Sequence, residues 1–559
     1  MIAGSLSFRS SGKHSELFLW GLFIAWGVTV SLIATHHEFW RDEVRALSLV
    51  VQSSSLSDLF TSMQNEGHPL LWYLLLYTGY GTTGSVVVLP LLSFIIAGAS
   101  VYLLIFFSPF PRWMKTLFIF SGLPLYEYSV MARNYGISML LLFAFAALYP
   151  SRNRYPLVLG LLLASLSNTN IHSLILACLL MGLWTWDTLI AENHHLLSAE
   201  ARKLYMAMAI VIAGSAGALY TVWPTETMIA SDTTRHTLSH IVNAAVTAIV
   251  APATQFGELF PNFVPVKARI GLLLLPIMGL IVRPPVTLIA YAALLALSLL
   301  FSVVYSSWYR HQGLLVVFLM SLYWIVLASE KGTLCHKRVR GLFKGGLYGG
   351  MALLLLATLV TGGTNAYRDW IYQKSASKAF AQEFLNAGQK YKDAILIGEP
   401  DFLLEAVPYY AANPIYIKRE SRFGDAVRFV RNVQLDLGMG ELLCTAWRIQ
   451  KERNTPVLIV LGHRVLGMAP SDSNALSHSV SYFYQRTFAW SGEELENWRR
   501  YTVLERQFDR NVIGDEAYTV YSLNSTEASS PPHCSPGHGL GKDSTNSDHG
   551  LDRRISQRS

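Results

Sequence analysis

Long apolar stretches alternate with short polar connections over the first two thirds of the chain. Residues 17–35 (LFLWGLFIAWGVTVSLIAT) carry no charge and are long enough to cross a bilayer as a helix. Further apolar stretches follow at 85–107, 115–127, 135–150, 155–170, 172–190, 204–223, 270–282, 286–305, 312–329 and 345–363. The segments 69–80 and 240–256 are candidates for interfacial or additional helices. The pattern predicts an α-helical polytopic membrane protein with about 11 transmembrane helices in residues 1–365.

The pattern changes near residue 364. Short apolar runs predict strands at 394–398, 415–417, 457–461 and 518–521. Helical periodicity lies between them, at 378–391, 402–411, 424–433 and 439–452. This alternation predicts an α/β domain over residues 366–524. Residues 525–559 are Ser, Pro, Gly, His and charged residues with little apolar content, which predicts a disordered tail.

Composition agrees with the hydropathy pattern. Hydrophobic residues make up 52% of the chain and charged residues only 14%, and the mean hydropathy is +0.33. These values exclude an ordinary soluble globular protein. The net charge of +7 does not indicate nucleic-acid binding, because most Lys and Arg residues fall in short loops between apolar stretches.

The distribution of Lys and Arg predicts the orientation in the membrane. Short loops rich in these residues, such as 112–115 and 152–154, stay on the cytoplasmic side. With the amino terminus inside and the first apolar stretch an uncleaved helix, the acidic loop after residue 35 and the α/β domain are extracytoplasmic. The expected location is the cytoplasmic (inner) membrane.

Two acidic motifs follow the first apolar stretch. They are Trp40-Arg41-Asp42-Glu43 and Glu66-Gly67-His68-Pro69. Carboxylates at a membrane boundary are costly unless they have a task or a partner. Asp42 is the first candidate for a catalytic base, with Glu43 as its orienting neighbour. Asp42, Glu43 and His68 are also candidate ligands for a divalent cation, Mg²⁺ or Mn²⁺.

Cationic and histidine side chains recur at the predicted outer ends of later stretches. They are Arg133 in Arg133-Asn134-Tyr135, His172 beside Asn170, and the pair Arg310-His311. Arg310, with His311 or Arg133, is suited to hold a phosphate by charge-assisted hydrogen bonds. Glu66, His68 and His172 complete the set of candidate substrate-binding residues.

Each candidate also has a structural interpretation. Asp42 could pair with Arg45 on a surface helix, and Glu66 and His68 could cap the helix that Pro69 begins. Glu127 and Arg133 could form an ion pair. His172 could be a hydrogen-bonded histidine at a helix end, and Arg310 could extend to lipid headgroups.

Four cysteines, at 178, 335, 444 and 534, show no metal-binding spacing. Cys444 and Cys534 lie far apart in sequence, and Cys534 falls in the predicted tail. We therefore expect no disulfide between them.

The order of these motifs over residues 15–365 resembles the GT-C superfamily of membrane glycosyltransferases. Its members include protein mannosyltransferases and the transferases that modify lipid A with aminoarabinose. The resemblance implies a GT-C-like helical domain that takes a hexose or pentose from a polyprenyl-phosphate sugar. The acceptor would be a glycan, lipid or protein on the extracytoplasmic face. Attack opposite the phosphate would invert the anomeric centre. The chain departs from the best-studied members in its short second outer loop, which has no further Asp-Glu pair.

Two other classes fit the same pattern. A transporter or flippase for lipid-linked glycans would also be polytopic and carry ionisable groups in the membrane, although no inverted repeat is apparent. A catalytically inactive relative would bind a lipid-linked glycan without cleaving it.

Overall fold

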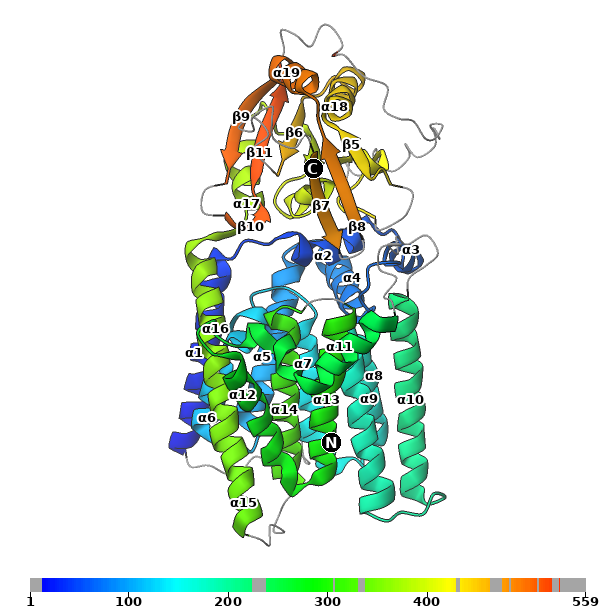
Figure 1. Cartoon of the computed structure of the whole chain (residues 1–559), viewed down its shortest axis with the longest axis vertical. Helices are drawn as coiled ribbons and strands as arrows, with labels where there is room; N and C mark the ends of the chain where they lie inside the picture. Colours follow the sequence, from blue (N-terminus) through cyan, green and yellow to red (C-terminus); the bar gives the residue numbers. More distant parts are fainter. Residues whose placement is uncertain are drawn as a thin grey trace.

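The computed structural model describes residues 13–223, 238–304, 307–329, 337–428, 433–462, 475–481, 484–509, 512–524 and Pro532. A helical part and a smaller part that contains the sheets are stacked along the long axis of the molecule (Figure 1). The short helices α2 (Arg41–Gln52), α3 (Leu56–Ser62) and α4 (Leu71–Thr83) lie where the two parts meet.

Seven helical segments of the described chain are long and apolar enough to cross a membrane. They lie in α1 (Lys13–His36), α5 (Val88–Phe107), α9 (Ile171–Trp186), α10 (Ala199–Val222), α13 (Pro284–Val303), α14 (Tyr309–Ser329) and α16 (Met351–Ile371). The segment of α9 continues into the π-helical turn η4 (Asp187–Ala191), and that of α16 begins in α15 (Lys337–Lys344). This is the architecture of a polytopic membrane protein.

The other four expected spans are shorter or interrupted helices. They are α6 (Arg112–Ile119) with the π-helical turn η2 (Leu123–Glu127), α7 (Tyr135–Leu148), α8 (Pro156–Ser167) and α12 (Val266–Gly279). With the 3-10 turn that follows it, α7 forms one apolar helix over Tyr135–Ser151, which is shorter than each of the seven segments above, as is α8. Of the about 11 expected spans, seven are therefore seen as long apolar segments in the described residues, and the other four are shorter helices. α4 and α11 (Leu238–Val250) occupy the two segments that were candidates for interfacial or additional helices.

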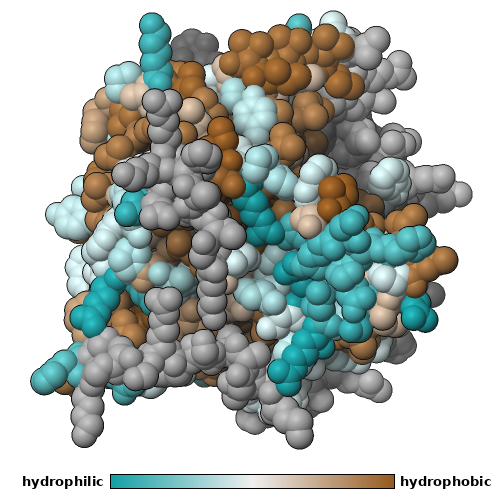
Figure 2. Space-filling model, turned by 90° about the horizontal axis from the view of Figure 1, so that it is seen from below, coloured by the Kyte–Doolittle hydropathy of each residue, from teal (hydrophilic) through white to brown (hydrophobic). Residues whose placement is uncertain are grey.

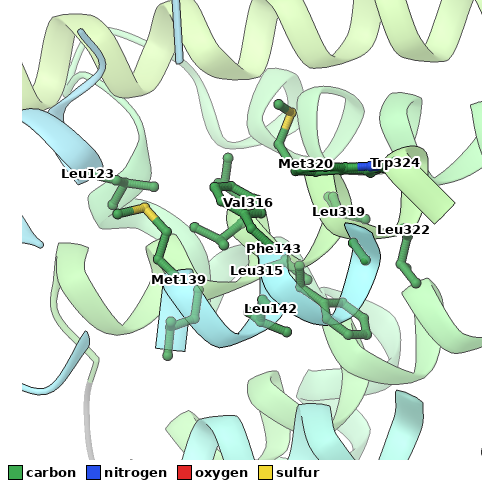
Figure 3. Packing of buried hydrophobic residues seen from close by; sticks show 14 of the residues in the cluster. Leu123, Met139, Leu142, Phe143, Leu315, Val316, Leu319, Met320, Leu322 and Trp324 are labelled. Carbon is green, nitrogen blue, oxygen red and sulfur yellow. The ribbon is translucent and has the colours of Figure 1, made fainter. Parts of the chain in front are cut away.

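Helix α14 is the centre of the helical part. Its residues from Tyr309 to Val326 are all buried. Figure 3 shows Leu315, Val316 and Leu319 of α14 packed against Met139, Leu142 and Phe143 of α7. The Phe143 and Trp324 rings are 5.9 Å apart. Because α7 and α14 begin at Tyr135 and Tyr309, this packing brings Arg133 and Arg310 to the same end of the helical part.

Helix α16 approaches η2 through two glycines. A Cβ atom on Gly122 would lie 2.2 Å from the Gly362 Cα atom, so neither position accepts a side chain without a shift of the backbone. This contact holds the segment that ends at Glu127 against the helix that leads into the C-terminal domain.

The end of the helical part away from the C-terminal domain is seen in Figure 2, where hydrophilic residues gather among apolar ones. Asp187 lies at this end, at the end of α9, where it accepts hydrogen bonds from the Tyr149 hydroxyl at 2.5 Å and from Arg283. Arg152 pairs with Glu192 nearby. This polar network joins the ends of α7, α9 and α13.

The C-terminal domain is built around a four-stranded sheet of order β2-β6-β11-β9. Strands β2 (Ile395–Glu399) and β6 (Val457–Leu461) are parallel, whereas β11 (Tyr518–Leu523) is antiparallel to both β6 and β9 (Thr502–Phe508). Alternate residues of β2 enter two apolar cores. Leu396 packs on the side of α17 (Ser377–Phe380), and Ile395 and Ile397 pack on the side of α18 (Met439–Arg453) and α19 (Gly492–Tyr501).

Smaller sheets complete this domain. One contains β5 (Asp436–Gly438), β8 (Tyr484–Ala489) and β7 (Ala475–Ser481); the others pair β1 (Gln373–Ser375) with β10 (Val512–Glu516) and β3 (Tyr416–Ile417) with β4 (Arg422–Phe423). The four predicted strands and the helix at 439–452 are present. The predicted helix at 402–411 is instead the 3-10 turns η10 (Asp401–Leu404) and η11 (Val407–Tyr409).

The predicted helix at 424–433, the predicted tail and the cysteines differ from or lie partly outside what the structure describes. Residues 424–428 are not helical, and the next four positions of the predicted helix lie outside the described residues, as does the predicted tail apart from Pro532. Cys444 is disulfide-bonded. Cys178, the other cysteine of the described residues, is free, and the expectation about Cys534 lies outside the described residues.

Candidate active site at the membrane boundary

The candidate site forms around the start of α2. Helix α1 ends at His36, four residues connect it to α2, and Asp42 lies in the first turn of α2. The apolar face of α2 buries Val44, Leu47 and Val50. An acidic residue in a first turn is stabilised by the partial positive charge of the helix N-terminus. The apolar face of α2 therefore packs into the protein, and Asp42 lies at the edge of this face.

Asp42 is held by guanidinium groups from distant segments. Arg133 donates a hydrogen bond from Nη1 to Asp42 Oδ2 at 2.7 Å, and Arg310 Nη2 lies 3.5 Å from the same oxygen. Burial acts to raise the pKa of Asp42, but Arg133, Arg310 and Arg41 outweigh it and hold the pKa well below its ordinary value. The Asp42 side chain is 33% exposed, whereas those of Arg133 and Arg310 are each 11% exposed. The site therefore presents an ionised, accessible carboxylate between two nearly buried cations.

The Trp40 indole lies among three cationic side chains. The Arg41 and Arg310 guanidinium carbons are each 5.6 Å from its ring centroid, and Lys374 Nζ is 5.3 Å from it. Trp40 Nε1 and Arg310 Nε are both buried and have no hydrogen-bond partner. Two unpartnered donors beside a cationic cluster are suited to bind an anion.

Glu43 faces away from Asp42. It is fully buried, accepts a hydrogen bond from the Ala132 amide at 2.8 Å and lies 3.0 Å from His37 Nε2. His37 Nδ1 lies 2.7 Å from Asp369 on α16. Burial alone would lower the pKa of His37, but Glu43 and Asp369 outweigh it and raise the pKa to about 10. Glu43 is therefore placed to orient the loop rather than to meet a substrate.

Glu66 and His68 have different surroundings. Glu66 accepts two hydrogen bonds from Arg45, at 2.7 Å from Nε and 2.6 Å from Nη2. His68 is half-buried, and its pKa falls to about 4 through burial and the nearby Arg133. A neutral imidazole beside Arg133 and Asp42 can accept or donate one hydrogen bond. The helix after Pro69 begins at Leu71 and has no side-chain cap, so neither residue caps it.

His172 and His311 stack on each other below this cluster. Their ring centroids are 5.2 Å apart with an interplanar angle of 12°, and Tyr135 contacts His311 edge to face at 5.4 Å. His311 Nδ1 accepts a hydrogen bond from the Trp308 amide at 2.9 Å. Both histidines are buried, so they support the start of α14 and Arg310.

The contacts decide between several of the alternative interpretations. Asp42 pairs with Arg133, whereas Arg45 pairs with Glu66, and the ion pair of Arg133 in the described residues is with Asp42 rather than Glu127. Arg310 is buried and lies inside the site, so it is not a headgroup anchor on the surface. No group of three or more His, Cys, Asp or Glu side chains in the described part of the chain is arranged to hold a metal ion. Because Glu43 is occupied by His37, the pair Asp42-Glu43 does not offer two free carboxylates to one cation.

Several residues of the site were not identified from the sequence. They are His37 at the end of the first span and Asp369 and Lys374 near the end of the last one. Glu127 is 7% exposed. Among the surrounding cations, Arg310 and Lys374 have the strongest electrostatic interaction with its carboxylate. Lys374 could have been identified from its position directly after the last span, where a cation lies at the membrane boundary.

No protein-family model matches this chain, and no curated protein is similar enough in sequence to indicate a family.

Proposed function

We propose that this protein is a GT-C-like membrane glycosyltransferase that transfers a monosaccharide from a polyprenyl-phosphate-linked donor to an acceptor. The observation that carries the proposal is the position of Asp42. Its accessible carboxylate lies beside Arg133 and Arg310, at the end of an apolar helical bundle, and two buried donors next to it have no partner. The order of motifs that resembles the GT-C superfamily supports the same function.

The chemistry requires a base and an anion-binding group. The acceptor oxygen forms a bond to the anomeric carbon while the bond from that carbon to the phosphate oxygen breaks. The acceptor proton passes to Asp42, and polyprenyl phosphate leaves with the electron pair. Arg310 and the indole N–H of Trp40 stabilise the negative charge that develops on the leaving phosphate. Approach from the face opposite the phosphate inverts the anomeric centre.

A bound phosphate would also change Asp42. In the ligand-free arrangement the guanidinium groups hold the pKa of Asp42 low, which makes it a weak base. A donor phosphate competes with Asp42 for Arg310 and thereby raises the pKa of Asp42 toward its ordinary value. The base thus becomes stronger when the donor is in place.

The surroundings of α1 suit a lipid-linked donor. An apolar groove of about 700 Å³ lies between α1 and α5, lined by residues that include Phe23, Trp26, Leu32, Phe94 and Tyr102. Thr35 lines the same groove and lies two residues before His37. A chain in this groove would have its head near Trp40, where the unpartnered donors lie.

The proposed location is the cytoplasmic membrane with the site on the extracytoplasmic face. The distribution of Lys and Arg in the short loops supports this orientation. The disulfide at Cys444 also supports it, because structural disulfides persist in oxidising compartments outside the cytoplasm. Asp42 and the C-terminal domain lie at the same end of the molecule, since Arg41 pairs with Asp515.

The test uses full-length protein in nanodiscs with a panel of polyprenyl-phosphate-linked hexoses and pentoses and a cell-envelope extract as acceptor. A glycosyltransferase converts one of these donors to polyprenyl phosphate, which mass spectrometry detects. Transfer of intact donor between leaflets of proteoliposomes without cleavage would instead identify a flippase. Binding without cleavage of any donor would identify an inactive relative.

A further inference from the structure

Strand β1 carries a lysine from the C-terminal domain to the site. It directly follows α16 and pairs in parallel with β10. A Cβ atom on Gly514 of β10 would lie 2.1 Å from the Lys374 carbonyl oxygen, so only glycine permits this close approach. Ser375 is fully buried and Lys374 is half-buried, as expected for neighbouring residues on opposite faces of a strand.

The loop that contains Trp40 is fixed to the same strand pair. The Ser377 hydroxyl donates a hydrogen bond to the Phe39 carbonyl at 3.2 Å, and the Arg41 amide donates to Glu516 Oε1 at 2.9 Å. Glu516 is fully buried on β10. These contacts hold Trp40 and Lys374 in one arrangement, with Lys374 Nζ 5.3 Å from the indole centroid.

Lys374 and Arg310 contact the same indole ring. Among the described residues, Lys374 Nζ is not within ion-pair distance of a carboxylate, although Glu127 lies within its electrostatic range. Two cations beside one ring repel each other, and an anion bound to both would offset that repulsion. Trp40 Nε1 and Arg310 Nε, both buried and unpartnered, belong to the same group of donors.

We propose that Lys374 binds the phosphate of the lipid-linked donor together with Arg310 and Trp40. This inference rests on the proposed function. Arg310 provides directional hydrogen bonds to phosphate oxygens, and Lys374 provides a point charge. The C-terminal domain then supplies a substrate-binding residue, and the site is incomplete without it.

The experiment measures the affinity of full-length protein in nanodiscs for farnesyl phosphate, with farnesol as the uncharged comparison. The variants are Lys374→Gln, Lys374→Arg and the exposed Lys392→Gln as the matched control. Loss of one charged contact to phosphate lowers affinity by roughly 10- to 100-fold. We expect this loss in Lys374→Gln for farnesyl phosphate but not for farnesol, near-parental affinity in Lys374→Arg, and no change in Lys392→Gln.

The outcomes separate the two proposals. If the parent binds farnesyl phosphate and Lys374→Gln binds it equally well, Lys374 is not a phosphate ligand and the proposed function stands. If the parent binds farnesyl phosphate no better than farnesol, the proposed phosphate site fails and this inference fails with it. Equal weakening of farnesyl phosphate and farnesol in Lys374→Gln would indicate a general structural effect and overturn the phosphate role. Melting temperatures of all variants report whether they fold.

Discussion

Arg41 and Asp515 form a two-pronged ion pair between the first loop of the membrane part and the C-terminal domain. Nη1 and Nη2 of Arg41 lie 2.7 and 2.8 Å from the two carboxylate oxygens of Asp515. The Asp515 side chain is 60% exposed, so the pair contributes little stability by itself. It nevertheless links the C-terminal domain to the loop that carries Asp42. A second, buried ion pair contributes more to the stability of this contact between the two parts.

That buried contact is Arg45, which joins Glu66 of the membrane part to Glu405 of the C-terminal domain. The three side chains are 12%, 5% and 4% exposed. Arg45→Met removes the cation between two buried carboxylates and leaves Glu405 only the Val427 amide as a donor, which costs about 3–5 kcal/mol. We expect a lower melting temperature and faster proteolysis between residues 372 and 376.

The control for this prediction is Arg506→Met, which breaks an exposed ion pair with Glu383. Its cost should be within about 1 kcal/mol. Equal melting temperatures for Arg45→Met and Arg506→Met would show that the Arg45 bridge does not hold the domain in place.

Asp42→Asn should abolish sugar transfer while the protein still folds. The change is nearly isosteric and removes the group that accepts the acceptor proton. Loss of a general base typically lowers the rate by about 10²- to 10⁴-fold. Turnover of the lipid-linked donor measures the effect, with the exposed Asp393→Asn as the matched control.

Glu127→Gln distinguishes Asp42 from the other acidic side chain near Arg310. We expect a smaller loss of turnover than in Asp42→Asn, because Glu127 is 7% exposed and Asp42 is the more accessible carboxylate. Full turnover in Asp42→Asn together with inactive Glu127→Gln would transfer the role of the base to Glu127.

Arg310→Lys should weaken donor binding even though it keeps the charge. Lysine cannot reproduce the two parallel hydrogen bonds of a guanidinium to phosphate, nor its contact with the Trp40 ring. We expect roughly a 10-fold increase in KM for the lipid-linked donor, and a larger one in Arg310→Ala. The exposed Arg202, on α10, is the control, and Arg202→Lys should leave KM unchanged. An unchanged KM in Arg310→Ala would show that other cations bind the donor phosphate.

His37 should make stability depend on pH in the alkaline range. Its pKa is raised from an ordinary value of 6.5 to about 10 in the folded protein. A raised pKa stabilises the fold fully below the ordinary value, and this stabilisation is lost as pH rises through the folded value. The parent should therefore lose melting temperature between about pH 7 and pH 10.

His37→Gln removes this dependence. We expect a lower melting temperature near pH 7 and a flatter profile toward pH 10, because Glu43 and Asp369 no longer face an imidazolium. The exposed His195→Gln should follow the parent. Identical pH profiles for the parent and His37→Gln would contradict a protonated His37.

The sequence by itself determined the broad architecture. Hydropathy is a local property of short stretches of chain, so it indicated the seven long spans, the change of character near residue 364 and three of the four strands of the central sheet, β2, β6 and β11. The same reasoning placed Asp42 in the first loop at the membrane boundary. It predicted about 11 spans, of which seven are long apolar segments in the described residues, whereas stretches such as 135–150 and 270–282 form shorter helices.

Only the tertiary structure decided which partners each residue of the acidic pair Asp42-Glu43 contacts. Asp42 and Glu43 are neighbours, but a helix turns adjacent residues by about 100°, so one faces the rim and the other the interior. Which face meets Arg133 and Arg310, and which meets His37, depends on the packing of α7, α14 and α16. The position of Lys374 beside Trp40 depends on the pairing of β1 with a strand that begins at Val512. Ion pairs between segments so far apart leave no periodic signal in the sequence, because they form only when the folded chain brings those segments together.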